Sequence, residues 1–416
     1  MISFILAVIK LLIVLCIVAT VHELGHFLAA KFFKVGVKEF SIGFGKKLFQ
    51  KKYKETMYSL RCLPLGGYVM IEGEGEEHSD SETSFSKQNS FVKIIILVMG
   101  VVFNIILATV ILMSIAFSYP TATTTIDKLQ EDSILKEYGI DKGDTILKIN
   151  NDKVCLANEL IDNKYSDKNE TVITYEENGT VKEITLKNAV KSVGQIGIAF
   201  KTEEGKSTRK VDTIFPGKAA DKAGIKEQDE IISINDNKVS NSSEIIDIVT
   251  KNSNKKLIFK INRNNEIIEK EIIPEETKIF DLGIYSTELV DTDLSYAFKK
   301  TLNTISSVFK SYIDIFKGKV SLDDVSSIIG IGNVVNKAED IIEYLNLLAI
   351  ISLAIGVANI LPFLPLDGGK IVIVLIEAIT RKKVPEKLEI ILTYLGFGLL
   401  MLITVFVVIK DIIRLI

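Results

Sequence analysis

Residues 2–26 read ISFILAVIKLLIVLCIVATVHELGH, an apolar run that ends in the pattern His-Glu-x-x-His. Residues 2–21 contain a single charge, Lys10, and are long enough to cross about 30 Å of hydrocarbon as a helix. We expect this helix to continue through the motif to about Phe33, which places both histidines at or just inside one membrane face. Ionisable side chains are costly at that depth, so their presence indicates function.

The motif itself predicts a metal site. Residues four apart share one face of a helix, so His22 and His26 can bind one Zn²⁺ while Glu23 reaches the water on the metal. The chain has only three histidines, which makes a chance match improbable. We therefore predict two zinc ligands and a catalytic base. The third histidine, His78, lies in a stretch rich in Glu and Ser and is expected to be solvated rather than a ligand.

Composition places the chain in a broad class. Hydrophobic residues make up 47% of its 416 residues, which indicates a membrane protein of roughly two to four domains. A net charge of −3 gives no basic field, so nucleic acid is not an expected partner. Cys16, Cys62 and Cys155 are far apart in sequence and are predicted to be buried small apolar residues rather than ligands or disulfide partners.

Lysines orient the first two spans. Residues 31–54 contain eight lysines and one acid, Glu39, and a short Lys-rich loop beside a span is typical of the cytoplasmic side. The histidines are therefore expected near the cytoplasm. Residues 94–117 carry no charge and are predicted to be a second span that runs outward. This span contains Gly100 and Asn104, and we expect the Asn side chain to bond to another helix.

A third uncharged run covers residues 344–366, and prolines and glycines break its end in the segment NILPFLPLDGG, residues 359–369. Asp367 would reach the same membrane level as the histidines and is the predicted third ligand, although a helix-capping role is the alternative. Residues 381–387 carry four basic residues and mark a second cytoplasmic loop, and residues 390–409 form a fourth span. This topology puts both termini outside.

The loop between the first two spans is predicted to contain strands. Within residues 35–71, three short stretches at 40–45, 56–61 and 64–69 are separated by turn-forming residues. A small sheet or re-entrant hairpin beside the metal follows, because non-helical backbone at membrane depth is tolerated only against protein or a wet cavity. An ordinary cytoplasmic loop is the alternative.

The polar middle of the chain contains an internal repeat. Residues 138–154 and 223–239 align without gaps, with eight of seventeen positions identical. Each copy has a Gly-Ile turn, a short alternating strand and an Asn-rich hairpin turn, and the pattern resembles PDZ domains, especially with PGKAA at 216–220. PDZ domains bind extended peptides at a sheet edge. The copies could instead be spacers or size filters.

The predicted organisation has five parts. The first membrane half covers residues 1–117 and the second covers 341–416. Two extracytoplasmic PDZ-like α+β domains cover residues 121–205 and 206–285. Residues 290–340 form an amphipathic helix and linker, because 294–317 place apolar residues at helical intervals with four lysines between them. That helix is expected on the bilayer surface or, alternatively, packed against the repeat.

With His-Glu-x-x-His ending one span and Asn359 to Gly369 breaking another, the chain resembles the site-2 protease family of intramembrane zinc metalloproteases, specifically its bacterial RseP-type branch with tandem PDZ domains. The likeness extends to residues 40–45, 64–68 and the repeat. It implies that Asn359 and Pro362 line the site and help to hold an unwound substrate. Its zinc ligands and base would be those of the motif and the broken span, namely His22, His26, Asp367 and Glu23.

Some residues depart from the family pattern. Val101 stands where a proline usually follows Gly100, Lys370 stands where this branch often has His, the second proline of the broken segment falls one place later at Pro365, and residues 326–330 lack the usual Gly-Pro. None of these departures falls on a predicted ligand. They concern the way in which a substrate would be positioned.

The resemblance implies a multi-pass α-helical protein of the bacterial cytoplasmic membrane that hydrolyses peptide bonds within or near the transmembrane segments of single-span proteins. Typical substrates would be membrane-bound anti-sigma factors and remnant signal peptides. The alternative is a membrane-anchored PDZ scaffold with a vestigial metal site, although intact motif residues disfavour it. A transporter is less consistent with four spans and no repeat between the membrane halves.

Overall fold

The computed structural model describes residues 2–74, 81–161, 165–166, 170–203, 206–215, 217–317 and 340–415. His78, Pro216 and the departure at 326–330 therefore lie outside the described residues. The chain forms two compact units. We call Met1–Tyr119 with Thr292–Ile416 the membrane unit, and Pro120–Asp291 the repeat unit.

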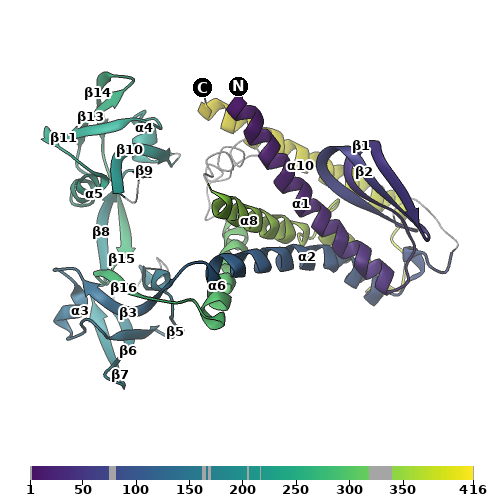
Figure 1. Cartoon of the computed structure of the whole chain (residues 1–416), viewed down its shortest axis with the longest axis horizontal. Helices are drawn as coiled ribbons and strands as arrows, with labels where there is room; N and C mark the ends of the chain where they lie inside the picture. The colour runs from purple at the N-terminus through teal and green to yellow at the C-terminus, as the bar shows by residue number, and fades with distance from the viewer. Residues whose placement is uncertain are drawn as a thin grey trace. The chain divides into compact units, whose positions relative to one another are not determined.

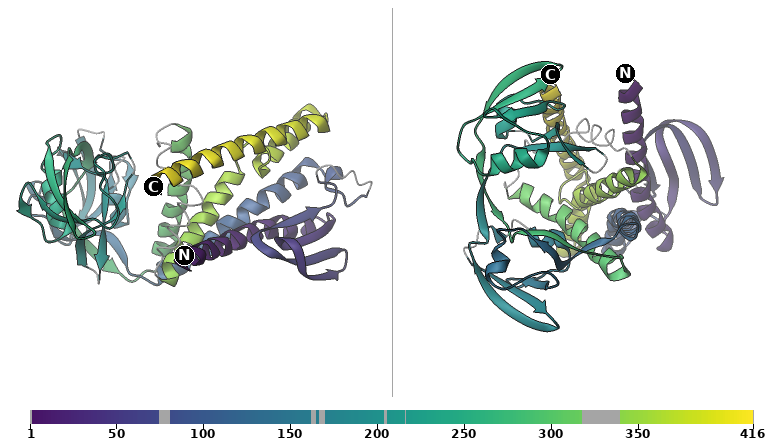
Figure 2. Two further views of the ribbon diagram at one scale, coloured as in Figure 1. Left: turned by 90° about the horizontal axis from the view of Figure 1, so that it is seen from above. Right: turned by 60° about the vertical axis from the view of Figure 1, so that its left-hand side comes forward.

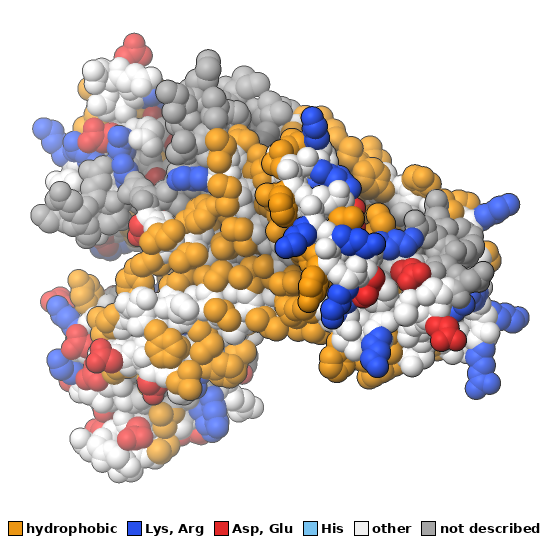
Figure 3. Space-filling model, turned by 45° about the vertical axis from the view of Figure 1, so that its right-hand side comes forward, with side chains coloured by type: hydrophobic (Ala, Val, Ile, Leu, Met, Phe, Trp, Pro, Cys, Tyr) orange, Lys and Arg blue, Asp and Glu red, His pale blue; other side chains and the backbone are white. Residues whose placement is uncertain are grey.

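The membrane unit contains the predicted spans. Among the described residues, four helices are long and apolar enough to cross a membrane (Figure 1), and they are α1 (Ile2–Phe32), α2 (Ser90–Phe117), α8 (Ile341–Asn359) and α10 (Glu386–Leu415). Side-chain caps fix where two of them begin. The Asn89 side chain accepts a hydrogen bond from the Val92 N–H, and Asp340 accepts two at the start of α8. Hydrophobic side chains spread over the face seen in Figure 3, as expected for helices in lipid.

Small residues let α2 pack closely between two other spans. A Cβ at Gly25 of α1 would lie 2.2 Å from the Met99 carbonyl oxygen of α2, so only glycine permits this approach. On the other side, Ala108 of α2 packs with Ala349 of α8 in one buried cluster. Helix α2 therefore contacts both α1 and α8.

The loop after the first span is a sheet, as one of the two readings predicted. It consists of β1 (Val37–Tyr53) and β2 (Thr56–Ile71), two long curved strands in place of three short ones. The first part of β1 pairs with both halves of β2, since Phe40 lies opposite Tyr58 and Val69. The hairpin lies beside α1 in both views of Figure 2. Cys62, predicted to be buried, is exposed because it lies where β2 curves between its two halves.

Two further helices complete the described part of this unit, after the short 3-10 helix η1 (Phe85–Lys87). Helix α6 (Leu294–Phe316) contacts α2 and α8, and its Tyr312 hydroxyl donates to the Ala354 carbonyl oxygen at 2.8 Å. Neighbouring helices cover only part of its apolar face, because Phe298 is 50% and Leu302 43% exposed. The two expected positions of this helix stay predictions. Helix α9 (Asp367–Thr380) begins after the predicted break, where Gly368 lies against the backbone of Ile360.

The repeat unit contains two cores with matching residues. Ile146 and Ile149 are fully buried in the first core, and the aligned Ile231 and Ile234 are fully buried in the second. The aligned asparagines also match, since Asn150 and Asn235 both have positive φ, which asparagine tolerates. The elements are β3 (Thr121–Leu129), α3 (Ile134–Glu137), β4 (Thr145–Ile149), β5 (Asp152–Lys153), η2 (Ala157–Ile161), β6 (Glu170–Glu177), β7 (Thr180–Lys187), β8 (Val190–Gln195), β9 (Ile198–Glu203), β10 (Lys206–Ile214), α4 (Ala219–Lys222), β11 (Glu230–Ile234), β12 (Asn237–Lys238), α5 (Ser242–Thr250), β13 (Leu257–Arg263), β14 (Glu266–Ile272), β15 (Glu275–Phe280) and β16 (Ile284–Val290).

Strand pairing shows that the repeats are not simply consecutive. One sheet has the order β16-β3-β4-β6-β7, the other has the order β14-β13-β11-β10-β9, and β8 pairs with β15 between them. The two repeats share a hydrogen bond at the start of the strand that follows a glycine. The Gln130 N–H donates to the oxygen of Gly283, which precedes β16, at 2.8 Å. The Phe215 N–H donates to the oxygen of Gly197, which precedes β9, at 3.0 Å. The first repeat is therefore completed by a strand that follows the second repeat in the chain.

Candidate metal centre

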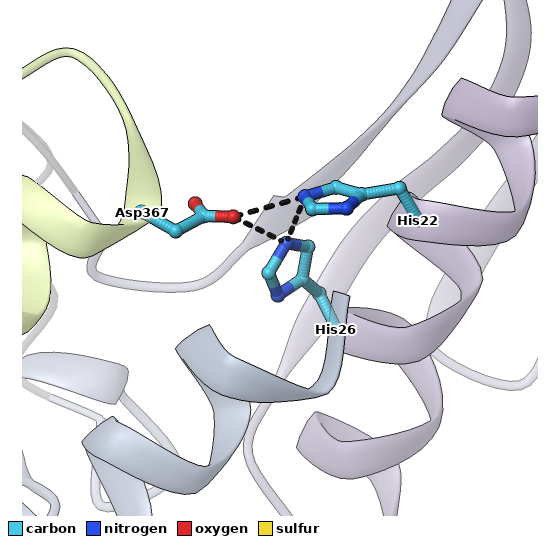
Figure 4. Close-up of side chains that lie close together, drawn as sticks. All are labelled: His22, His26 and Asp367. Atoms are coloured by element: carbon cyan, nitrogen blue, oxygen red, sulfur yellow. Dashed lines mark hydrogen bonds and ion pairs between the residues drawn. The ribbon is translucent and has the colours of Figure 1, made fainter. Parts of the chain in front are cut away.

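The motif histidines and the aspartate after the broken span meet in the interior of the membrane unit. His22 and His26 lie one turn apart on α1, and each is only 6% exposed. Their Nε2 atoms are 3.1 Å apart, and Asp367 Oδ2 lies 2.9 Å from the first and 3.3 Å from the second. Figure 4 shows the carboxylate of α9 pointing at both rings. Two segments separated by most of the sequence thus form one cluster.

The cluster has the donor set and spacing that zinc requires. Ligand atoms of a tetrahedral zinc site, with bonds of about 2.0–2.1 Å, lie about 3.3 Å apart. The three separations here are 2.9, 3.1 and 3.3 Å. Two imidazoles and a carboxylate also leave one of four positions for water or substrate, which is typical of catalytic rather than structural zinc. The three side chains therefore fit a catalytic zinc ion.

Helix α2 contacts the far side of both rings. His26 Nδ1 donates to the Ile96 carbonyl oxygen at 2.8 Å, which leaves the Nε2 lone pair free for a metal. His22 Nδ1 lies 3.4 Å from the side-chain amide of Asn104. This contact agrees with the expectation that Asn104 bonds to another helix. The sequence did not indicate that the bonding partner would be a histidine of the candidate metal site. The feature of the sequence that marked Asn104 was an amide in an otherwise apolar span.

Gly100 of α2 lies directly against the ligand atoms. A Cβ at this position would be 2.5 Å from His26 Nε2 and 2.7 Å from His22 Nε2, so any side chain would occupy the site. The sequence contains this glycine within a predicted span but does not assign it to the site. A glycine is required at position 100 only because α1 and α2 cross at this point.

Glu23 faces a cavity beside the cluster. Its Oε2 accepts a hydrogen bond from the Val69 N–H of β2 at 3.0 Å, which holds the carboxylate next to the strand. The cavity has a volume of about 530 Å³ and is lined by Glu23, His26, Asp367 and the end of β2. Glu23, two of the candidate metal ligands and the end of β2 therefore border one cavity.

A polar network holds that strand in place. Arg61 donates to Glu39 at 2.9 Å and to the Tyr68 hydroxyl at 2.6 Å, and Ser59 donates to the same glutamate at 2.6 Å. Because these residues belong to both halves of β2 and to β1, the network fixes the curvature of the hairpin. Tyr68 precedes the residue that contacts Glu23, so the network also sets the position of the strand at the cavity.

An ion pair joins the end of the hairpin to α9. Lys370 Nζ lies 2.6 Å from Glu74 Oε1, and both residues line the cavity. Lys370 is one of the positions where the chain departs from the family pattern, and the sequence did not indicate its partner. The pair connects the segment after β2 with the helix that carries Asp367.

Asn359 and Pro362, predicted to bind substrate, lie at the end of α8 and in the turn that follows it. Asn359 is the last residue of α8 and is half-buried, and Pro362 is exposed in the turn that follows. Within the part of the chain that the structure describes, neither residue lines the cavity beside Glu23. Their predicted role in substrate binding stays a prediction.

Family and sequence comparisons with known proteins cover most of the chain. The model of peptidase family M50 matches residues 10–403. The chain is 30% identical over 396 residues to a candidate zinc metalloprotease of Clostridium acetobutylicum, covering 94% of this chain and 93% of that one. It is 26% identical over 435 residues to the zinc metalloprotease RasP of Oceanobacillus iheyensis, covering 98% and 99%. A solved HtrA3 PDZ domain with a phage-derived ligand matches 21% of this chain and 91% of its own, at 24% identity and a TM-score of 0.19.

Proposed function

Because the chain belongs to peptidase family M50 and is a multi-pass zinc metalloprotease, we propose that it cuts peptide bonds within or near the transmembrane segment of single-span membrane proteins. The observation that carries this proposal is the cluster of His22, His26 and Asp367 between apolar helices, with Glu23 beside it. A protease whose site lies between membrane helices is suited to substrates that are themselves in the membrane. Membrane-bound anti-sigma factors and remnant signal peptides are the proposed substrate classes.

Each residue has a defined part in the reaction. His22, His26 and Asp367 would hold Zn²⁺, and the bound ion would supply a Lewis acid for the scissile carbonyl and for a water molecule. Glu23 takes the proton from the attacking water at a carboxylate oxygen and passes it to the leaving amine. The Val69 N–H orients this carboxylate through its 3.0 Å hydrogen bond.

The edge of β2 provides a place for the unwound substrate. A transmembrane helix hides its carbonyl groups in internal hydrogen bonds, so the segment to be cut must become extended. The residues of β2 from Tyr68 to Ile71 line the cavity next to Glu23. A substrate segment that pairs with this edge as an added strand would present its carbonyl groups to the metal site.

The catalytic glutamate supplies the test. Glu23→Gln keeps the size of the side chain and removes the base, so a co-expressed single-span substrate should remain uncut while the variant still binds zinc and stays in the membrane. Undiminished cleavage by this variant would rule out the mechanism. Protein that folds but binds no zinc would favour the scaffold alternative.

The orientation in the membrane rests on the basic loops. We propose that the site lies near the cytoplasmic face of a bacterial cytoplasmic membrane and that the repeat unit lies outside, because residues 31–54 and 381–387 are rich in Lys and Arg. Reporter fusions within each loop test this orientation, and a cytoplasmic repeat unit would contradict it.

The repeats are proposed to bind extended peptide segments. A cavity of about 430 Å³ is lined by residues of β9 and α5, including Phe200 and Ile246, which suits an apolar side chain beside an added strand. The full-length protein should bind peptides with apolar ends, and Ile246→Lys should weaken this binding. Equal binding by both forms would leave the spacer alternative.

A further inference from the structure

One side chain next to the metal cluster has an unmet hydrogen-bonding need. Asn104 of α2 is fully buried, with its Nδ2 atom 3.4 Å from His22 Nδ1. Among the described residues, nothing pairs with its buried Oδ1 atom. Leaving a buried polar atom without a partner costs about 1–3 kcal/mol, and lipid around the unit supplies no water to relieve this cost.

The neighbouring histidine has the opposite need. Nε2 of His22 faces Asp367 Oδ2 at 2.9 Å and His26 Nε2 at 3.1 Å, so it is the nitrogen available to a metal. A neutral imidazole that offers the Nε2 lone pair carries its hydrogen on Nδ1. His26 donates that hydrogen to the Ile96 carbonyl oxygen. His22 requires an acceptor of its own, and an amide nitrogen cannot accept a hydrogen bond.

A rotation of the amide that exchanges its oxygen and nitrogen would place Oδ1 against the Nδ1–H of His22, so that each of these two groups gains a partner. The oxygen and nitrogen of an Asn side chain have the same shape, so which of them faces a neighbour follows from the hydrogen bonds they form. We propose that Asn104 is a positioning residue whose amide oxygen accepts the Nδ1–H of His22 and so holds Nε2 toward the zinc. The inference rests on the zinc site of the proposed function.

The backbone of Asn104 is itself fixed by α8. The Ser352 hydroxyl donates to the Asn104 carbonyl oxygen at 3.0 Å. A Cβ at Gly356 would lie only 3.2 Å from Asn104 Cβ, so α8 presses closely against this part of α2. The amide therefore has little freedom to leave His22, and α8 leads directly into the turn before Asp367.

Substitutions at this position separate the inference from an ordinary helix-packing role. Asn104→Leu has a similar volume and no acceptor, whereas Asn104→Asp keeps an acceptor and would form a carboxylate–histidine–zinc arrangement. If the amide served only to pack two helices, a carboxylate in the interior would be the more harmful change. If the amide serves His22, the carboxylate restores what leucine removes.

The experiment measures Zn²⁺ affinity of the purified full-length protein by competition with a chelator, beside thermal unfolding of the metal-free form. We expect Asn104→Leu to bind zinc about 10–100-fold more weakly and Asn104→Asp to bind within roughly threefold of the unchanged protein. Thr109→Val is the matched control, because the Thr109 hydroxyl bonds within its own helix to the Ile105 oxygen at 2.7 Å. It should bind zinc normally.

Three outcomes would overturn the inference. Asn104→Leu could bind zinc as tightly as the unchanged protein, or Asn104→Asp could lose as much affinity as the leucine variant. If the leucine variant does not fold, the affinity of the aspartate variant decides alone. Absence of zinc binding by the unchanged protein would remove both the proposed function and this inference, whereas zinc binding that is indifferent to position 104 would remove only the inference.

Discussion

Gly100→Ala should strongly weaken metal binding, because the added methyl group has no room beside the candidate ligands. Its Cβ would lie 2.5 Å from His26 Nε2, and ordinary van der Waals contact begins at 3.4 Å. The ring would have to move by about 0.9 Å, whereas zinc–ligand distances tolerate only about 0.2 Å. The His22 ring, at 2.7 Å, would be displaced as well.

The expected result is a loss of zinc affinity of about 100-fold or more, with complete loss of substrate cleavage. The metal-free protein should be destabilised only by the cost of overpacking, about 1–3 kcal/mol. The assays are zinc content and chelator competition on purified protein, with thermal unfolding of the metal-free form. They separate a blocked site from a misfolded chain.

A matched glycine serves as the control. Gly398 of α10 also lies in a candidate span, and a Cβ there would meet nothing within 4 Å. Gly398→Ala should therefore bind zinc and cleave substrate as the unchanged protein does. Normal zinc affinity in Gly100→Ala would refute the close approach of α2 to the ligands, and with it the view that α2 shapes the site.

Two further predictions concern the hairpin. Lys370→Met and Glu74→Gln each break the same 2.6 Å ion pair, so their effects on thermal stability should not add. A double-mutant cycle should give a coupling energy of about 1 kcal/mol or less. Additive effects would show that the ion pair contributes nothing to stability. Burial raises the pKa of Glu39, but hydrogen bonds from Ser59 and Arg61 outweigh it and lower the pKa below its ordinary value of 4.5. The ionised carboxylate therefore stabilises the hairpin above about pH 4.5, and this contribution is lost as the pH falls through the lower folded pKa. Glu39→Gln should remove the acid dependence of hairpin protection in hydrogen exchange, and an unchanged dependence would show that another group causes it.

Most of the membrane architecture could be predicted from the sequence. Long uncharged runs identify spans because hydrocarbon excludes charge and unpaired backbone groups. The broken segment at 359–369 indicated where the third run ends, and the structure begins α9 at Asp367. The repeat was visible because residues such as Ile146 and Ile231 are buried at equivalent core positions.

Other features of the fold could not be predicted. Nothing in the sequence indicated that β16 would complete the sheet of β3, because strand pairing between distant segments leaves no local pattern. The same limit applies to α6, whose amphipathic pattern shows that one face is covered but not which surface covers it.

The sequence by itself indicated the residues that the structure brings together in the candidate site. His22, Glu23 and His26 are linked by helical periodicity, and Asp367 is a carboxylate where an apolar run stops. Only the tertiary structure decided how these groups are supported. Gly100 and Asn104 lie on a different helix from the motif, and their contacts with the histidines depend on the depth and rotation of α2 against α1. Hydropathy fixes that a helix spans the membrane, whereas side-chain packing fixes which face it turns to its neighbour.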